Sequence, residues 1–378
     1  MKKERLMKVM TVFGTRPEGI KMAPLVNCLK NDPQVNHVCV NTAQHRDMLD
    51  QVMAIFQISP NYDFNIMKQI QTPEMISTAI LTRLSKVLDL EKPEIVLVHG
   101  DTTTAFISSY AAFMKQIPVG HVEAGLRTGN RYSPFPEEMN RKLIDQLATY
   151  HFAVTESNKQ NLMNEGICEK DILVTGNTVI DALLEATNKP FQFSPPLVDI
   201  VERSGRILLM TTHRRENLQK LQGVYEAINQ IVQMYPDLHV IFPVHKNPLV
   251  RKAVEQSLHF NDQIHITEPL DYLSFAHLMK ASYLILTDSG GIQEEAPALG
   301  KPVFVARENT ERLEGERAGT IKLTGLNSAR IVQEIRLVLD DEGAYQKMAQ
   351  AINPYGDGFS SQRIKDFLLK AYRSQGGL

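Results

Sequence analysis

The sequence predicts an α/β protein made of two doubly wound, Rossmann-like domains that face each other across a cleft. Short apolar segments alternate with amphipathic helical patterns along the 378 residues. Several of these segments are unbroken runs of Val, Ile and Leu, which is typical of parallel strands covered by helices on both faces. The chain is also too long for one ordinary core, because a domain averages roughly 150 residues.

The expected strands form two sets with a proline-containing break between them. The first set is 8–13, 37–42, 94–100, 117–122, 151–155 and 172–176, and the second is 206–213, 238–245, 263–267, 283–288 and 301–306. The segment 187–205 contains three prolines and no clean period, which indicates the linker. A last helix is expected at about 360–372.

The composition indicates a globular protein without a nucleic-acid or membrane partner. Hydrophobic residues make up 43% of the chain, charged residues 22%, and the formal net charge is -2 without a Lys/Arg-rich run. No signal peptide and no apolar stretch of about 18 residues is found, so no membrane span is expected. The three cysteines are widely separated, which favours reduced thiols and a cytoplasmic location. The histidines lack metal-ligand spacing, so no metal is predicted.

Charged residues follow the first predicted strand, at the edge where open parallel sheets bind ligands. The segment "FGTRPEGIK" places Arg16 and Lys21 at a helix start after Gly14. Free N–H groups at such a junction can bind an anion. A turn glycine beside a solvated arginine is the structural alternative.

Three carboxylates occupy neighbouring strand ends or helix starts in the first half. Asp101 follows the expected strand 94–100, and Glu123 follows the expected strand 117–122. Glu137 opens a helix, with Arg141 one turn further along. An N-cap would explain Asp101, and the helix dipole would explain Glu137. Glu123 is followed by a loop and caps nothing. Carboxylates that lie close together repel unless a proton or substrate uses them, so the group favours acid/base chemistry.

The strand ends of the second half carry cations and a glycine pair. His213 and Arg214 follow one strand and His245 another. The segment "DSGG" offers the N–H groups of 289–291 to a diphosphate, without the Lys that would grip a γ-phosphate for transfer. Glu295, one turn further on, is placed to accept ribose hydroxyl hydrogens or simply to favour the helix start.

These motifs together resemble the non-hydrolysing UDP-N-acetylglucosamine 2-epimerases of bacteria. The matching segments include "VFGTRPEGIKMAPL", "VHGDTTT", "GHVEAGLRTG", "YSPFPEEMNR", "GNTVIDALL", "HRREN", "LTDSGGIQEEAP" and "NPYGDG", in order and nearly end to end. The resemblance implies a glycosyltransferase-B fold whose last helix returns to the first domain. The domains would then be 1–186 with 360–378, and 187–359. It also implies a homodimer that interconverts UDP-GlcNAc and UDP-ManNAc without a cofactor.

The resemblance further implies elimination of UDP to 2-acetamidoglucal and its re-addition with the proton on the opposite face. Asp101, Glu123 and Glu137 would be the acid/base groups. The remaining roles carried over by motif are diphosphate stabilisation by His213 and Arg16, support of the same cleft by Lys21 and Arg141, a place near the diphosphate for Arg312, phosphate binding by Ser289, Gly290 and Gly291, ribose binding by Glu295, and a uracil wall at Phe275. A core aromatic is the structural alternative for Phe275.

Many bacterial members bind a second UDP-GlcNAc as an activator, and the residues implied here are Gln44, His45, Arg214 and His245. Asp47 and Ile70 stand where Gln and Arg can occur in the family. The sequence therefore leaves two alternatives, a chain with the activator site and a chain without it. Loss of an Arg that faces a diphosphate removes a charge-assisted hydrogen bond.

Four other functions are alternatives to epimerisation. A relative acting on a 2,3-diacetamido uronic acid nucleotide would need an additional cation that the sequence does not identify. A retaining glycosyltransferase would need only part of the acid cluster. A non-catalytic nucleotide-sugar sensor would be expected to lose Asp101, Glu123, Glu137 or His213, and all are present. A hydrolysing epimerase would release free ManNAc. The product is expected to supply cell-envelope polysaccharide.

Overall fold

The computed structural model describes residues 5–44, 46–67, 72–212, 221–244, 246–259 and 261–374. The chain forms two compact units, Met1–Ala182 with Tyr355–Leu378, and Leu183–Pro354. The first boundary lies inside helix α7 (Thr178–Thr187), whereas the sequence pattern places it after 186. The segment 187–205, expected to be only a linker, contains a short helix, α8 (Leu197–Arg203).

The first unit is a seven-stranded sheet in the order β3-β2-β1-β4-β5-β6-β7. All of its strand pairs are parallel. Its strands are β1 (Met7–Phe13), β2 (Val35–Asn41), β3 (Tyr62–Asp63), β4 (Ile95–His99), β5 (Val119–Ala124), β6 (Tyr150–Ala153) and β7 (Ile172–Val174). Its helices are α1 (Arg16–Lys30), α2 (Asp47–Ile55), α3 (Pro73–Glu91), α4 (Thr103–Met114), α5 (Glu137–Leu147), α6 (Glu156–Asn164), the start of α7, and α16 (Ser360–Ser374), with a 3-10 turn at Glu169–Asp171.

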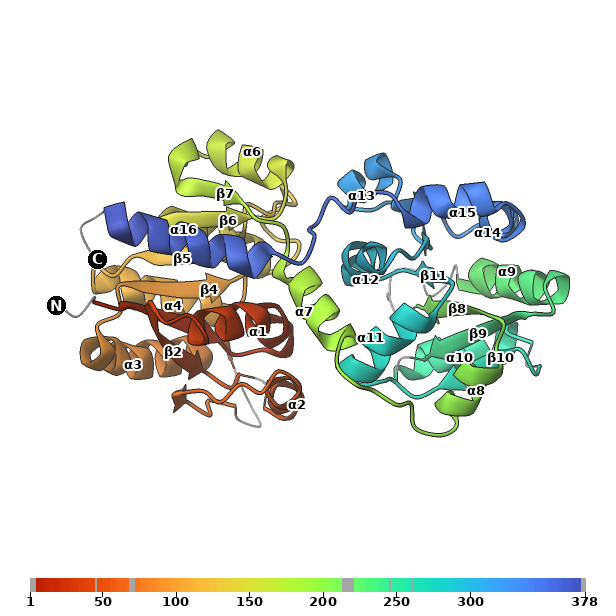
Figure 1. Ribbon diagram of the computed structural model, residues 1–378, viewed down its shortest axis with the longest axis horizontal. Coiled ribbons are helices and arrows are strands. Elements are labelled where there is room, and N and C mark those ends of the chain that lie inside the picture. Colours follow the sequence, from red (N-terminus) through yellow and green to blue (C-terminus); the bar gives the residue numbers. More distant parts are fainter. Residues whose placement is uncertain are drawn as a thin grey trace. The chain divides into compact units, whose positions relative to one another are not determined.

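Helices cover both faces of this sheet. Side chains of α3, α4 and α5 pack with β1, β2 and β4 in one apolar cluster. Helix α16 packs against α1, and Figure 1 shows both in front of the sheet. The return of the last helix to the first unit therefore completes the layer on that side.

The second unit is a six-stranded parallel sheet in the order β10-β9-β8-β11-β12-β13. Its strands are β8 (Arg206–Thr211), β9 (Leu238–Pro243), β10 (Ile264–Thr267), β11 (Leu284–Thr287), β12 (Val303–Val305) and β13 (Ile321–Leu323). Its helices are α8, α9 (Leu221–Met234), α10 (Pro248–Ser257), α11 (Tyr272–Ala281), α12 (Gly290–Glu295), α13 (Leu313–Ala318), α14 (Ser328–Asp340) and α15 (Glu342–Ala349), with a 3-10 turn at Ala296–Leu299. The predicted fold class, two doubly wound α/β sheets, is confirmed.

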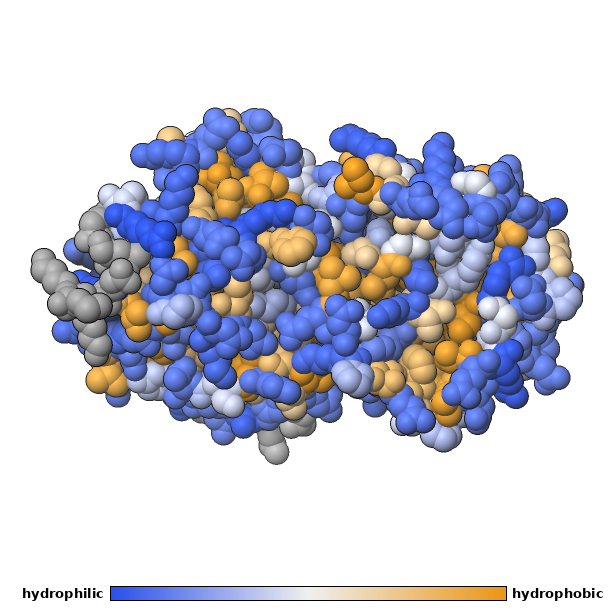
Figure 2. Space-filling view, viewed as in Figure 1, coloured by the Kyte–Doolittle hydropathy of each residue, from blue (hydrophilic) through white to orange (hydrophobic). Residues whose placement is uncertain are grey.

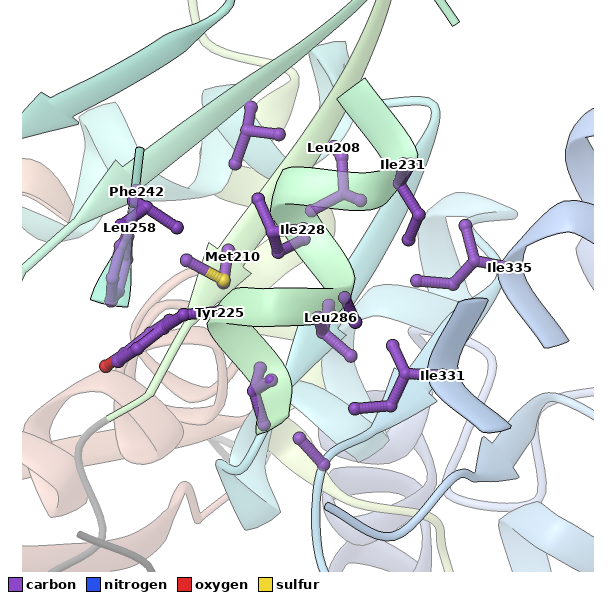
Figure 3. Packing of buried hydrophobic residues seen from close by; sticks show 14 of the residues in the cluster. Leu208, Met210, Tyr225, Ile228, Ile231, Phe242, Leu258, Leu286, Ile331 and Ile335 are labelled. Atoms are coloured by element: carbon purple, nitrogen blue, oxygen red, sulfur yellow. The ribbon is translucent and has the colours of Figure 1, made fainter. Parts of the chain in front are cut away.

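The core of the second unit lies between its sheet and helices α9 and α14. Figure 3 shows Leu208 and Leu286 from the sheet meeting Ile228 of α9 and Ile331 of α14. These four side chains are fully buried. Burying an aliphatic side chain of this size contributes about 1.5–3 kcal/mol. The apolar runs that predicted strands therefore also form the core.

Each sheet has a switch point, where two adjacent parallel strands are followed by connections that lead toward opposite edges of the sheet. In the first unit β1 and β4 are neighbours, with Val9 beside Ile95. In the second unit β8 and β11 are neighbours, with Leu208 beside Leu284. Open α/β sheets bind ligands at the carboxyl end of this point. The loops after β1, β4, β8 and β11 are therefore the places to examine.

Hydrophilic residues cover most of the face of each unit shown in Figure 2, with hydrophobic residues in smaller groups between them. In the part of the chain that the structure describes, no helix is long and apolar enough to cross a membrane.

Gly125, just after β5, provides a stability test of the close packing between this turn and α6. Its φ is +81°, and a Cβ there would lie 2.3 Å from the backbone oxygen of Asn158 in α6. Gly166 has a similar φ of +89° with open space around it. We expect Gly125→Ala to lower the free energy of unfolding by roughly 2–4 kcal/mol, because backbone strain and overpacking add. Gly166→Ala should cost only the strain, about 1–2 kcal/mol. Urea unfolding of both variants measures the difference, and equal midpoints would contradict the close approach.

Candidate active site

The loop after β1 is closed by a buried glutamate. Thr15 caps α1, and the Glu18 carboxylate accepts the N–H groups of Gly14 at 3.1 Å and Thr15 at 2.8 Å. The expectation that these N–H groups are free for an anion is therefore wrong. Gly14 has a packing role instead, because a Cβ there would lie 1.9 Å from the Thr42 hydroxyl. The partly exposed Arg16 remains at this helix start.

The loop after β4 presents Asp101. Helix α4 is capped by Thr102, whose hydroxyl accepts the N–H of Ala105 at 3.0 Å, so the N-cap explanation of Asp101 is wrong. The Asp101 carboxylate instead accepts a hydrogen bond of 2.6 Å from the buried Arg141 guanidinium. Burial raises the pKa of Asp101 above its ordinary value, and although Arg141 opposes this rise, the charge of Glu123 adds to it.

Glu123 lies near the end of β5 in an unusual backbone conformation. Its φ is +67°, and the pairing of β5 with β6 shifts register between Val122 and Ala124. A bulge of this kind re-aims a side chain, and strained non-glycine residues concentrate at functional sites. The carboxylate pairs with Lys21 and accepts a hydrogen bond of 3.0 Å from the Asn177 amide.

His99, the last residue of β4, lies behind the same carboxylate. Its Nε2 is 3.6 Å from Glu123 Oε2. Burial lowers the pKa of His99 to about 3, so the ring is neutral at physiological pH. Among the residues that the structure describes, His99 Nε2 makes no hydrogen bond. His99 and Asn177 were missed as site residues, although both lie in motifs that the sequence analysis quotes, "VHGDTTT" and "GNTVID".

The two glutamates that open α5 have different environments. Glu138 is fully buried, and its carboxylate accepts the N–H groups of Thr128 and Gly129, each at 3.1 Å. Glu137 is partly exposed, and its negative charge raises the pKa of Asp101. The ion pairs described for Arg141 join it to Asp101 and Glu138, not to Glu137 one turn before it.

The first unit therefore gathers five of the predicted residues into one electrostatic cluster. The charges of Arg141, Glu123, Lys21 and Glu137 all act on Asp101. A carboxyl group of raised pKa, Asp101, lies beside a second carboxyl group, Glu123, and each pairs with its own cation. Such an arrangement can remove a proton from one group and deliver one to another.

The loop after β11 brings the predicted phosphate and ribose residues together in the second unit. Ser289 immediately precedes α12. A Cβ on Gly290 would lie 3.4 Å from the guanidinium carbon of Arg312, and a Cβ on Gly291 would lie 3.2 Å from Glu295 Oε1. The Arg312 guanidinium is itself held by Glu294 and Glu311, each at 2.8 Å.

A cavity of about 190 Å³ adjoins this loop. Its lining residues are Thr211, Thr212, Pro243, Pro269, Leu270, Phe275, Ser289 and Ile292. Phe275 and Ser289 therefore face the same hollow at the switch point of the second sheet. Larger hollows, of about 430 Å³ beside α14 and about 390 Å³ beside α16, contain none of the predicted site residues.

Several predicted residues lie outside the part of the chain that the structure describes, namely His45, Ile70, His213, Arg214, His245 and the side chain of Asp47. The remaining activator candidate, Gln44, accepts a hydrogen bond of 2.9 Å from the Thr104 hydroxyl at the start of α4. No group of three or more His, Cys, Asp or Glu residues within the described ranges is arranged to hold a metal ion.

Comparisons with known proteins agree over nearly the whole chain. The family model described as UDP-N-acetylglucosamine 2-epimerase matches residues 27–369. A UDP-N-acetylglucosamine 2-epimerase of Bacillus subtilis is 52% identical, covering 97% of this chain and 96% of that protein. The crystal structure of a putative UDP-N-acetylglucosamine 2-epimerase from Listeria monocytogenes aligns with a TM-score of 0.92 at 47% identity, covering 98% of this chain and 97% of the other. The Neisseria meningitidis UDP-GlcNAc 2-epimerase, solved bound to UDP-GlcNAc, aligns with a TM-score of 0.83 at 46% identity, covering 96% and 100%.

Proposed function

The chain belongs to the UDP-N-acetylglucosamine 2-epimerase family of isomerases, and on this premise we propose that it epimerises UDP-GlcNAc to UDP-ManNAc by eliminating and re-adding UDP. In the forward step the C2–H and C1–O bonds break, a carboxylate takes the proton, and UDP leaves with the C–O electron pair. 2-Acetamidoglucal remains. The reverse step adds UDP to C1 and a proton to the other face of C2.

The observation that carries this proposal is the pairing of Asp101 with Glu123 at the switch point of the first sheet. The C2 proton is not next to a carbonyl group, so it can leave only as the C1–O bond breaks. Inversion at C2 needs a proton-transfer group on each face of the sugar. Asp101 with Arg141, and Glu123 with Lys21, supply two such groups with separate cations. General acid/base groups of this kind contribute about 10²–10⁴-fold each. We include Glu137 as the third member of the acid/base set.

We assign binding of the UDP to the second unit. Ser289, Gly290 and Gly291 would bind the diphosphate, with Arg312 beside them. Glu295 would accept the ribose hydroxyls, and the cavity wall at Phe275 would contact the uracil ring. His213 and Arg16 would stabilise the diphosphate as it leaves, since preorganised cations favour developing negative charge.

Regulation, assembly and pathway belong to the same proposal. We assign activation by a second UDP-GlcNAc to Gln44, His45, Arg214 and His245. The active form would be a homodimer, and the ManNAc product would supply cell-envelope polysaccharide.

Proton NMR of the purified protein with UDP-GlcNAc in D2O tests the reaction directly. We expect deuterium to enter C2 as UDP-ManNAc accumulates. Free ManNAc with UDP would identify a hydrolysing enzyme, and binding without exchange would identify a nucleotide-sugar sensor. Either result would overturn the proposal.

The raised pKa of Asp101 leads to a pH prediction. Arg141 lowers that pKa against the effect of burial, so Arg141→Gln should raise it further. If Asp101 accepts the C2 proton as a carboxylate, it then becomes active only at higher pH. The acid limb of the pH–kcat profile should shift in the alkaline direction. Arg336→Gln, at a half-exposed arginine of α14, is the control and should leave the profile in place. An unshifted acid limb in Arg141→Gln would contradict the assignment.

Phe275 leads to a binding prediction. Stacking of a base on an aromatic ring contributes about 1–3 kcal/mol. We therefore expect Phe275→Ala to weaken UDP binding by roughly 5- to 150-fold. Isothermal titration calorimetry with UDP measures this change. Phe359→Ala, at an exposed phenylalanine, is the matched control and should bind UDP normally. Normal UDP affinity in Phe275→Ala would place the uracil elsewhere.

A further inference from the structure

Asp101 lies between two residues that are each held by a buried, titratable side chain. Gly100 is held by His121 and Thr102 is held by Glu18. From this geometry we propose that Glu18 and His121 are positioning residues, which fix Asp101 for proton transfer at C2 without touching the substrate. The inference rests on the proposed function and identifies how its acid/base group is held in place.

Glu18 ties together the loops after the two central strands. One oxygen of its carboxylate accepts the N–H groups of Gly14 and Thr15, and the other accepts the Thr102 hydroxyl proton at 2.7 Å. The same hydroxyl accepts the N–H of Ala105 at the start of α4. Both the proton and a lone pair of the hydroxyl are therefore used, which fixes its orientation. Because Thr102 follows Asp101 directly, the position of α1 is transmitted to Asp101.

His121 holds the other side of Asp101. Its ring is fully buried in β5, with Nε2 2.7 Å from the Gly100 carbonyl oxygen and Nδ1 2.5 Å from Asp145 Oδ1. Although burial opposes ionisation, the charges of His121 and Arg127 hold the pKa of Asp145 below its ordinary value. Both neighbours of the ring are oxygen atoms that can accept hydrogen bonds, so the two contacts fix the orientation of the His121 ring. Arg127 donates to the second oxygen of Asp145 at 2.7 Å and anchors the chain of contacts.

Two further observations concern the same turn. Gly100 has a φ of +65°, and a Cβ there would lie 3.4 Å from Glu123 Oε2. The Asn140 amide donates to the Asp101 backbone carbonyl at 2.9 Å. Three consecutive residues, 100 to 102, are therefore fixed by side chains from α1, β5 and α5. The turn that carries one proton-transfer group also borders the other.

This arrangement predicts an effect on the chemical step rather than on substrate affinity. Misplacing a reacting group by about 1 Å can cost roughly 10²-fold in rate. The residues proposed to bind the uracil, the ribose and the phosphates at Ser289–Gly291 lie in the second unit. We therefore expect KM to stay unchanged when Asp101 is misplaced. A network that only stabilises the fold would lower the melting temperature and leave the kcat of the folded protein unchanged.

Thr102 allows the test without removing a buried charge. Thr102→Val keeps the shape of the side chain but loses the hydroxyl, and with it both the Glu18 contact and the cap of α4. Thr102→Ser keeps the hydroxyl. Thr72→Val is the matched control, since the Thr72 hydroxyl caps α3 at 3.3 Å from the Met75 N–H, away from Asp101. The kcat and KM for UDP-ManNAc formation, UDP affinity and thermal midpoints are measured for all four proteins.

We expect Thr102→Val to lower kcat by roughly 10²-fold with KM and UDP affinity unchanged. Thr102→Ser should restore most of the rate, and Thr72→Val should lose stability but keep kcat. An unchanged kcat in Thr102→Val, a Ser variant as slow as the Val variant, or a rise in KM alone would each overturn the role of Glu18. If the wild-type protein itself shows no exchange, the proposed function fails instead.

His121 needs a separate measurement, because its replacement would leave Asp145 in a buried site with one partner fewer. His121→Gln should lower kcat without changing UDP affinity, and its melting temperature shows whether the variant is folded. A folded His121→Gln variant with normal kcat would overturn the role of His121.

Discussion

Replacing Asp101 with Asn is expected to reduce the conversion of UDP-GlcNAc to UDP-ManNAc by about 10²–10⁴-fold. The amide has nearly the size of the carboxyl group, and its oxygen can still accept from Arg141, so the loop should keep its shape. The amide cannot take up or deliver a proton at C2. Because the residues proposed to bind the uracil, the ribose and the phosphates at Ser289–Gly291 lie in the second unit, the affinity for UDP should be unchanged. UDP-ManNAc formation measured by proton NMR and calorimetry with UDP separate the two effects.

Asp89→Asn is the matched control for this substitution. Asp89 is an exposed aspartate whose ion pair with Lys115 is remote from the switch point. Exposed pairs of this kind contribute about 0–1 kcal/mol, so its loss should change neither UDP-ManNAc formation nor UDP affinity. UDP-ManNAc formation at the wild-type rate in Asp101→Asn would show that Asp101 does not transfer the C2 proton. A parallel loss of UDP binding would show instead that the variant damages the nucleotide site.

The fold could be predicted because its central strands are long, apolar and regular. Runs such as 94–100 and 206–213 fill strands that are buried on both faces, and such runs have few other stable arrangements. The missed strands are β3, with two residues, and β13, with three. Neither segment is an unbroken apolar run, because β3 ends in Asp63 and the middle residue of β13 is Lys322. Their place in the sheet depends on pairing with β2 and β12, which the local sequence does not encode.

The residue types of the first-unit site could be predicted, but their partners could not. Asp101 and Thr102 can both cap a helix, and only the tertiary contacts decide that Thr102 does so. Glu18 stands in the first turn of α1, where an acidic residue is common, and its carboxylate occupies the N–H groups that were expected to be free. His121 sits in a strand as an apolar residue would, and its partners come from residues 100 and 145. Contacts between residues that are far apart in the chain leave no periodic signal in the sequence.

Glu123 shows why this site depends on backbone geometry as well as on residue type. A glutamate at a strand end carries no sign in the sequence that its φ will be positive. The shift in pairing between β5 and β6 places it there, and Lys21 and Asn177 hold the carboxylate once it has turned. A conformation of this kind costs about 1–3 kcal/mol and persists only where neighbouring contacts impose it. Neighbouring contacts hold Glu123 in this costly conformation beside Asp101. For this reason we assign Glu123 to the second proton transfer.

Replacing Glu123 with Gln should therefore reduce epimerisation by about 10²–10⁴-fold, as for Asp101. The glutamine oxygen can accept from Lys21 and Asn177, so the bulge should persist, but the amide cannot carry the proton. Glu169→Gln, at an exposed glutamate paired with Lys159, is the matched control and should leave the rate unchanged. Rates of UDP-ManNAc formation and melting temperatures of both variants are the measurements. Normal epimerisation by a folded Glu123→Gln variant would remove Glu123 from the mechanism.

The two variants together identify the face that each group serves. Elimination from one epimer requires only the group on its own proton face, whereas full epimerisation requires both groups. If Asp101 and Glu123 lie on opposite faces, each variant should still form UDP and 2-acetamidoglucal from one epimer, and the surviving epimer should differ between them. Single-turnover release of UDP from UDP-GlcNAc and from UDP-ManNAc measures this directly. Loss of the same epimer in both variants would place the two carboxylates on one face. Glu137 would then be the group on the other face, because it is the remaining carboxylate whose charge acts on Asp101.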